Sequence, residues 1–165
     1  MFTDEARFGR INRPRPCWAP IGTRPEVASQ LIREYIYLYG AACPKDGTCV
    51  YLIMPTSNTA CFQIFLNVLS RKFARQDILL VLDGAPNHRC KVLALPNNIS
   101  LLFLPPYSPA KENLWDEIRE KLFRNYALKS IDAVRAKLKQ AILYIERNPK
   151  LVQSITSFPY IVKSY

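Results

Sequence analysis

The sequence predicts an α/β domain with a mixed sheet. Three observations support this fold class: a pair of β-rich segments around a tight turn, an amphipathic segment after them, and two short apolar runs at 78–82 and 99–104. Apolar runs of this length are typical of strands that are buried on both faces in parallel pairing. A chain of 165 residues with 49% apolar side chains suits one domain with a single core.

The first half of the chain contains three predicted strands. Met1 to Asp4 is expected to be the tail of a first strand that is cut short. A connection rich in proline and arginine follows from Arg10 to Pro25. Segments 35–43 and 48–54 are rich in β-formers and flank Pro-Lys-Asp-Gly, so they are expected to form a hairpin. Trp18, within the connection, is predicted either to lie in the core or to stack on DNA bases.

The next elements follow from spacing and from proline. Ser57 or Asn58 is expected to cap a helix, because apolar residues then recur at intervals of three and four. The two apolar runs come next, and Pro105, Pro106 and Pro109 predict an extended elbow. Helices are expected at 111–126 and 130–144, and Ser130 or Asp132 is expected to cap the second of them. We therefore predict a folded domain over residues 1–146 and a basic tail over residues 147–165.

Charge is the most unusual feature of the composition. The net charge is +10 and the pI is near 9.6, which favours a polyanionic partner such as nucleic acid, although a basic protein can also simply be soluble. No apolar run is long enough for a bilayer and the N-terminus does not resemble a signal peptide, so no membrane partner and a cytoplasmic location are expected. The five cysteines form no Cys-x-x-Cys pair, which argues against a zinc site.

Asp83 is the acidic residue with the most informative position. It follows the buried run 78–82 directly, and open α/β sheets bind ligands at the carboxyl ends of their strands. The alternative is that Asp83 only caps a loop. If Asp4 ends a neighbouring strand, the two carboxylates converge and need a cation between them. Mg²⁺ prefers such hard oxygen ligands. The alternative for Asp4 is a charged residue at a ragged N-terminus.

A third acid is expected on the helix after the prolines. The candidates are Glu112, Asp116, Glu117 and Glu120. Glu112 lies in the first turn and roughly 90° from the centre of the apolar stripe, while Asp116 and Glu117 lie about 130° away. Asp116, Glu117 and Glu120 are better placed as solvated partners for nearby basic residues. Glu112 is therefore preferred.

Several segments resemble one family when they are taken in order. They are DEARFGR, CWAPIGTRP, YLYGA and the block ILLVLDGAPNH…LPNNISLLFLPPYSP…ENLWDEIREK. Together they look like the DDE endonuclease domain of mariner-like bacterial insertion-sequence transposases. This resemblance implies a ribonuclease H-like fold, in which a central sheet carries two aspartates and a following helix carries an acid.

The resemblance assigns Asp4, Asp83 and Glu112 as catalytic and metal-binding residues. It implies cleavage at transposon ends and strand transfer into target DNA, with two Mg²⁺ (or Mn²⁺) ions as cofactors. The predicted DNA contacts are Arg7, His88, Arg89 and Lys111. For His88 two roles stay open: contact with a scissile phosphate, or a hydrogen bond that shapes its loop.

The resemblance also implies partners and an alternative. The partners are transposon-end and target DNA, a helix-turn-helix part that is missing here, and a second copy in a homodimer. The location would be the bacterial cytoplasm, at the nucleoid. The link before Glu112 is about three residues shorter than the family's SPELNPxE form, and a displacement of even about 1 Å can cost a hundredfold in rate. The alternative is an inactive, truncated remnant that binds DNA non-specifically.

Overall fold

A computed structural model describes residues 1–12, 14–105 and 112–156 of the chain, without the side chains of Glu112, Asn113 and Leu122. Its elements along the chain are β1 (Phe2–Ile11), β2 (Leu31–Ala42), β3 (Cys49–Met54), α1 (Thr59–Lys72), β4 (Ile78–Leu82), β5 (Ile99–Phe103), α2 (Glu112–Ile118), α3 (Ile131–Glu146) and α4 (Pro149–Thr156). None of the helices in this described part has the length and apolar content that a membrane crossing requires.

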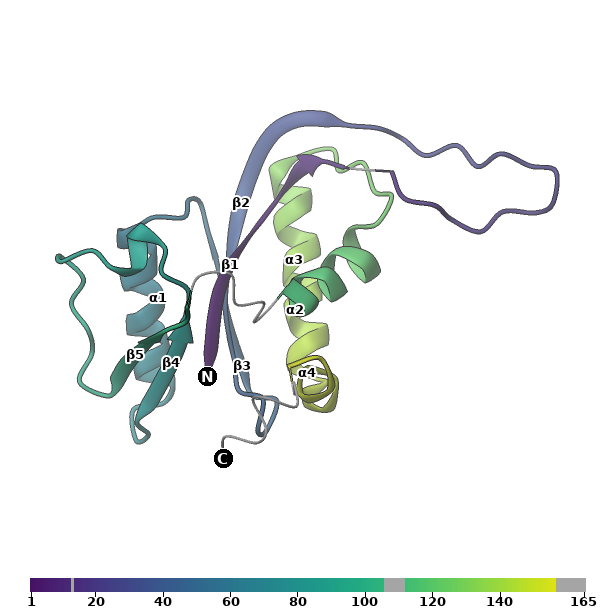
Figure 1. Cartoon of the computed structure of the whole chain (residues 1–165). Coiled ribbons are helices and arrows are strands. Elements are labelled where there is room, and N and C mark those ends of the chain that lie inside the picture. The colour runs from purple at the N-terminus through teal and green to yellow at the C-terminus, as the bar shows by residue number, and fades with distance from the viewer. Residues whose placement is uncertain (13, 106–111, 157–165) are drawn as a thin grey trace.

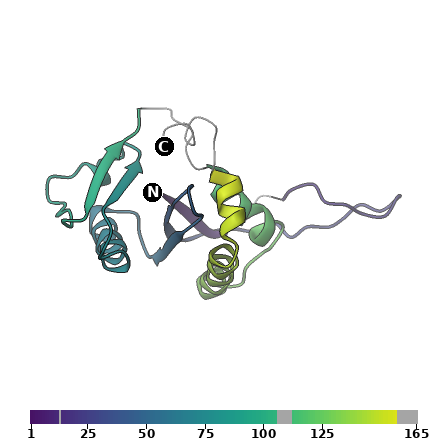
Figure 2. The ribbon, with the colours of Figure 1, turned by 90° about the horizontal axis from the view of Figure 1, so that it is seen from below.

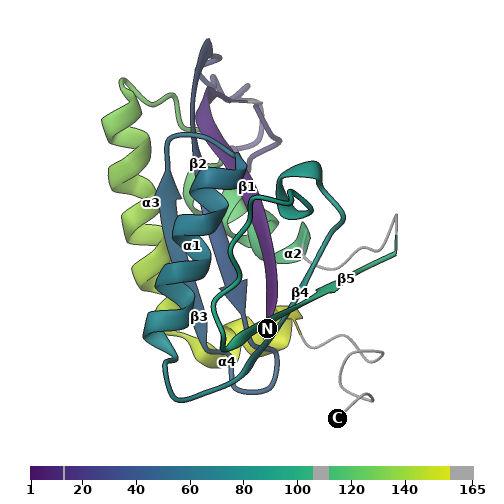
Figure 3. The same cartoon turned by 90° about the vertical axis from the view of Figure 1, so that its left-hand side faces the viewer.

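The strands form one mixed sheet in the order β3-β2-β1-β4-β5. The first three pair antiparallel, whereas β4 is parallel to both β1 and β5. Figure 1 shows the sheet running through the middle of the molecule, and Figure 3 shows α1 lying across it. The predicted α/β class with a mixed sheet is confirmed.

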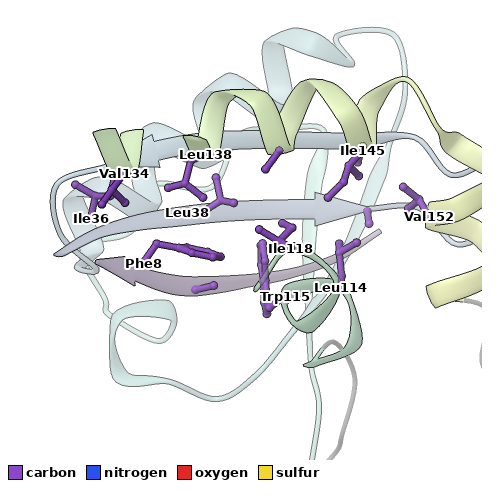
Figure 4. Close-up of a cluster of buried hydrophobic side chains, with 14 residues drawn as sticks. Phe8, Ile36, Leu38, Leu114, Trp115, Ile118, Val134, Leu138, Ile145 and Val152 are labelled. Carbon is purple, nitrogen blue, oxygen red and sulfur yellow. The ribbon is translucent and has the colours of Figure 1, made fainter. Parts of the chain in front are cut away.

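Two apolar clusters pack on opposite faces of this sheet, and among the described residues only the first includes β4 and β5. Leu79 and Leu102 are exposed on the other face, so the expectation that both apolar runs are buried on both faces is wrong. On one face α1 packs its Phe62, Phe65 and Leu69 against the inner residues of β4 and β5. On the other face α2, α3 and α4 pack against even-numbered residues of β1 and β2, as Figures 2 and 4 show. Because side chains alternate along a strand, consecutive residues of β1 face different helices.

Local predictions about turns and caps agree with the structure. In the hairpin turn the Cys43 amide donates to the Thr48 carbonyl at 2.8 Å, and Gly47 adopts a φ of +74° that favours glycine. Asn58 caps α1, since its side chain accepts the amide proton of Cys61. Ser130 caps α3 in the same way. These signals depend only on neighbouring residues, so the sequence is sufficient to predict them.

The prediction that the first strand ends at Asp4 is wrong. β1 has ten residues, and Asp4 is the third of them. Its length comes from pairing with β2, which continues from Phe2↔Ala42 to Ile11↔Leu31 with one irregularity after Gly9. The charged residues at 4–10 obscure the strand pattern in the sequence. The strand is stabilised by pairing with a distant segment rather than by local propensity.

Two helical predictions also need correction. The helix expected at 111–126 is α at Glu112–Ile118 and changes to a π-helical turn at Arg119–Phe123. Residues 149–156 lie in the predicted basic tail, yet they form α4, and Val152 is buried in the same cluster as α3. Burial of one apolar face explains why this short segment folds as a helix.

Residues 14–30, between β1 and β2, extend away from the rest of the domain, as Figure 1 shows in purple and blue. Trp18 and Ile21 on this segment are fully exposed. The prediction of Trp18 as a core residue is therefore wrong. Its stacking on DNA bases stays a prediction.

Candidate active site

Asp4 and Asp83 lie at matching positions on neighbouring parallel strands. The strands β1 and β4 pair at Phe2↔Val81, and the Val81 amide donates to the Met1 carbonyl at 2.8 Å. Asp4 is two residues after Phe2 on β1, and Asp83 is two residues after Val81, directly beyond the end of β4. The sheet thus places these two predicted residues at the carboxyl end of β4, where α/β sheets bind ligands.

Both carboxylate oxygens of Asp4 accept a hydrogen bond. Its Oδ1 accepts the Glu5 amide proton at 2.8 Å, and its Oδ2 accepts the indole proton of Trp115 at 2.8 Å. A carboxylate oxygen has two lone pairs, and among the described residues each oxygen has a single donor, which leaves one lone pair for another ligand. The Asp4 carboxylate is therefore fixed in orientation, and both of its oxygens can still accept a further bond.

Asp83 lies in a short loop that its own side chain organises. Its Oδ1 accepts the Ala85 amide proton at 3.1 Å and lies 2.8 Å from His88 Nδ1. The loop then makes one 3₁₀ turn over Pro86–His88. The Asp83 side chain is nevertheless 64% exposed, so it is accessible to a cation and to a substrate.

His88 is buried between two carboxylates. Its ring is 2% exposed, packs on Phe62 with centroids 4.5 Å apart, and places Nε2 at 2.9 Å from Glu5 Oε1. Burial lowers the pKa of His88, but the hydrogen bonds and charges of Glu5 and Asp83 raise it more, so the pKa lies above its ordinary value. In the protonated form both ring nitrogens donate, one to each carboxylate.

These contacts favour the loop-shaping role of His88, because both ring nitrogens already have carboxylate partners. A contact with DNA stays a prediction for this residue. Sequence reasoning missed Glu5 as a member of the site. Alternation along β1 could have indicated this role. Asp4 and Glu5 point to opposite faces of the strand, so Glu5 has to find a partner on the face away from Asp4.

The predicted third acid, Glu112, is the first residue of α2, and its side chain lies outside the described part. The competing acids on this helix have basic partners: Asp116 with Arg119 at 3.5 Å, and Glu117 with Lys121. Glu120 lies 3.1 Å from Arg15. Asp116 and Glu120 are solvated partners of basic residues as predicted, whereas the Glu117 side chain is only 22% exposed and its Oε1 is buried. Among the described side chains no group of three is placed to hold a metal ion, so the predicted three-carboxylate set stays a prediction.

Two of the predicted DNA contacts are exposed arginines. Arg7 is exposed and its guanidinium stacks on the Tyr35 ring at 4.5 Å. Arg89 is exposed and stacks on Phe103 at 4.8 Å. Its guanidinium also covers Gly84, where an added Cβ would lie 2.8 Å from Arg89 Nη2. Lys111 lies outside the described residues.

A groove with four arginines runs beside β1. Its lining includes Arg7, Arg15, Arg119 and Arg124, together with the acids Asp116 and Glu120. The arginines outnumber the acids, so the groove has a positive balance. A positive groove attracts the phosphate backbone of nucleic acid.

Known proteins resemble this chain in sequence and in fold. Uncharacterized protein y4pE/y4sA of Sinorhizobium fredii (strain NBRC 101917 / NGR234) is 34% identical over 104 residues, which cover 61% of this chain and 77% of that protein. The Mos1 transposase paired-end complex with the left transposon end has a TM-score of 0.59 at 17% identity, covering 95% of this chain and 55% of that one. The Mos1 mariner paired-end complex with Mn has a TM-score of 0.63 at 16% identity, with the same coverage.

At these identities the solved structures show the fold alone. They confirm the predicted ribonuclease H-like α/β fold, similar to the catalytic domain of Mos1 transposase. This chain spans about half the length of those transposases. The sequence profile described as DDE superfamily endonuclease matches residues 1–135. Since this match covers most of the chain, the protein belongs to the DDE superfamily endonuclease family.

Proposed function

We propose that this chain is the catalytic domain of a transposase, which cleaves DNA at transposon ends and joins the strand to target DNA. The observation that carries the proposal is the pair of aspartates at matching positions on β1 and after β4, beside a groove lined with arginines. Family membership and the likeness to Mos1 transposase support it. The non-catalytic remnant is not favoured, because Asp4 and Asp83 are both held by specific hydrogen bonds.

The donor groups suit a hard divalent cation. We propose that Asp4, Asp83 and Glu112 bind Mg²⁺ or Mn²⁺, with two ions in the working site. The described bonds use one lone pair on each oxygen of Asp4, and the described bonds of Asp83 use only Oδ1. Carboxylate oxygens are the ligands that both ions prefer. When bound, such ions neutralise phosphate charge and activate water or a 3′-hydroxyl.

The residues of the chain itself would orient and hold the substrate. Asp4 is fixed by Trp115, and Asp83 is fixed by His88, so little reorganisation is needed when charge develops in the transition state. The exposed guanidinium groups of Arg7 and Arg89 would hold phosphates near these carboxylates. The proposed partners are transposon-end and target DNA, a helix-turn-helix part that reads the ends, and a second copy in the active complex.

The proposal is tested by metal binding and by strand cleavage together. Mn²⁺ should raise the melting temperature of the chain, because an ion that binds only the folded state stabilises it by about 2.7 kcal/mol at a hundred times its Kd. Supercoiled plasmid should then be nicked with Mn²⁺ and not with EDTA. A chain that binds DNA but shows neither a melting shift nor nicking would be the inactive remnant.

DNA binding through the groove gives a separate expectation. Arg7→Ala should weaken binding to duplexes of any sequence to a similar extent, and the slope of log K against log salt should fall by about one unit. Fluorescence anisotropy over a range of salt concentrations measures both quantities. The matched control is Arg75→Ala, since Arg75 is exposed after α1 and outside this groove. Equal slopes for the two variants would exclude the groove as the DNA path.

A further inference from the structure

Trp115 links α2 to the first aspartate of the candidate site. The two residues are 111 positions apart in sequence, yet the indole N–H of Trp115 lies 2.8 Å from Asp4 Oδ2. Trp115 is 3% exposed and belongs to the apolar cluster that joins α2 and α3 to the sheet. Figure 4 shows its ring beside β1, next to Ile118. A buried indole in a packed cluster has few rotamers, so the direction of its N–H is fixed.

Gly40 provides the space for this ring. It pairs with Asp4 across β1 and β2. A Cβ at Gly40 would lie 2.6 Å from Trp115 Cη2 and 2.9 Å from a ring carbon of Tyr51. Tyr51 also meets the indole edge to face, with centroids 6.3 Å apart. The glycine therefore lets the indole lie close to the sheet, at the residue directly opposite Asp4.

The hydrogen bond acts on the orientation of the carboxylate. The Glu5 amide fixes Oδ1 of Asp4 and the Trp115 indole fixes Oδ2, so rotation of the carboxylate would break one of the two bonds. The same contact anchors α2 on β1. Glu112 is three positions before Trp115 on that helix, and positions three apart are neighbours on a helix surface.

We propose that Trp115 is a positioning residue, which orients the Asp4 carboxylate for a divalent ion and fixes the start of α2 against β1. Gly40 leaves the space in which the indole ring packs. This inference rests on the proposed function, because it assumes that Asp4 binds the ion. Hydrogen-bonded partners of ligating carboxylates typically contribute about 10- to 100-fold to metal affinity or activity. A tryptophan that only fills the core would contribute to stability and not to this affinity.

The hydrogen bond is tested first, without metal. The chain has two tryptophans, so Trp18→Phe leaves Trp115 as the only indole. Its N–H proton should give one NMR resonance, shifted downfield by the carboxylate and protected from exchange with water. Adding Asp4→Asn should move that resonance upfield. An indole resonance that does not respond to Asp4→Asn would overturn the proposal.

The second test measures Mn²⁺ affinity, by calorimetry, and plasmid nicking. Trp115→Phe keeps an aromatic ring but removes the donor, and we expect Kd for Mn²⁺ to rise and nicking to fall by about 10- to 100-fold. Trp18→Phe is the matched control for the affinity, because it makes the same change at an exposed position and should leave Kd for Mn²⁺ unchanged. Gly40→Ala keeps the donor but displaces the ring, so it should weaken Mn²⁺ binding as well, and it replaces Trp115→Phe if that variant does not fold.

The outcomes separate the inference from the proposed function. If the wild-type chain binds no Mn²⁺, the proposed metal site fails and the positioning role fails with it. If the wild type binds Mn²⁺, Asp4→Asn abolishes binding, and folded Trp115→Phe and Gly40→Ala bind as tightly as the wild type, then only the positioning role of Trp115 is wrong.

Discussion

Asp83→Asn should abolish metal-dependent nicking while leaving the fold intact. A ligand carboxylate contributes several kcal/mol to the stabilisation of the transition state through the ion that it holds. Since about 1.4 kcal/mol corresponds to a factor of ten, the expected loss is on the order of a thousandfold or more. The asparagine keeps an Oδ1 that can accept the Ala85 amide proton, and the side chain is 64% exposed, so little stability should be lost.

Asp77→Asn is the matched control for this change. Asp77 is exposed at the other end of the same strand, directly before β4, and its substitution alters the net charge by the same amount. Nicking rates with Mn²⁺, DNA affinity and melting temperatures are measured for both variants. If Asp83→Asn cuts as fast as Asp77→Asn, Asp83 is not a metal ligand and the proposed mechanism is wrong.

His88→Ala should destabilise the fold by roughly 3 kcal/mol, because it removes the partner of a carboxylate that is largely withdrawn from water. The side chain of Glu5 is 10% exposed and that of His88 is 1% exposed. Without the imidazole, Glu5 keeps its charge in a poorly solvated place and the Asp83 loop loses its internal bond. Nicking should also fall, by about 10- to 100-fold, because Asp83 is no longer held. Urea unfolding measures the first effect and plasmid nicking measures the second.

A double-mutant cycle with Glu5→Gln separates this contact from a general loss of packing. Removing the charge of Glu5 first should make His88→Ala less costly, by about 1 kcal/mol or more. Phe62 packs on the imidazole ring, and its contribution is the same in both arms of the cycle. Strictly additive losses would show that Glu5 and His88 do not stabilise each other.

The sequence was informative where a residue's role depends on its neighbours in the chain. The apolar runs at 78–82 and 99–104 could be read as parallel strands, and β4 and β5 do pair in parallel. Their expected burial on both faces is wrong, because Leu79 and Leu102 are about half exposed on the face away from α1. The hairpin turn and the caps at Asn58 and Ser130 could be predicted because they involve residues a few positions apart. The position of Asp83 followed directly from the end of the strand before it.

The tertiary structure decided what depends on distant segments. Ten residues of β1 are strand because β2 pairs with them. The partners of the candidate site are 83 residues apart for Glu5 and His88, and 111 apart for Asp4 and Trp115. The helical spacing predicts that Trp115 is a core residue. Only the structure shows that its ring packs over Gly40 and that its N–H donates to Asp4. Trp18 is a large aromatic residue of the kind that is often buried, yet it is exposed because its segment lies outside both apolar clusters. Periodicity indicates which side chains are buried, but hydrogen-bond partners are set by how the elements pack.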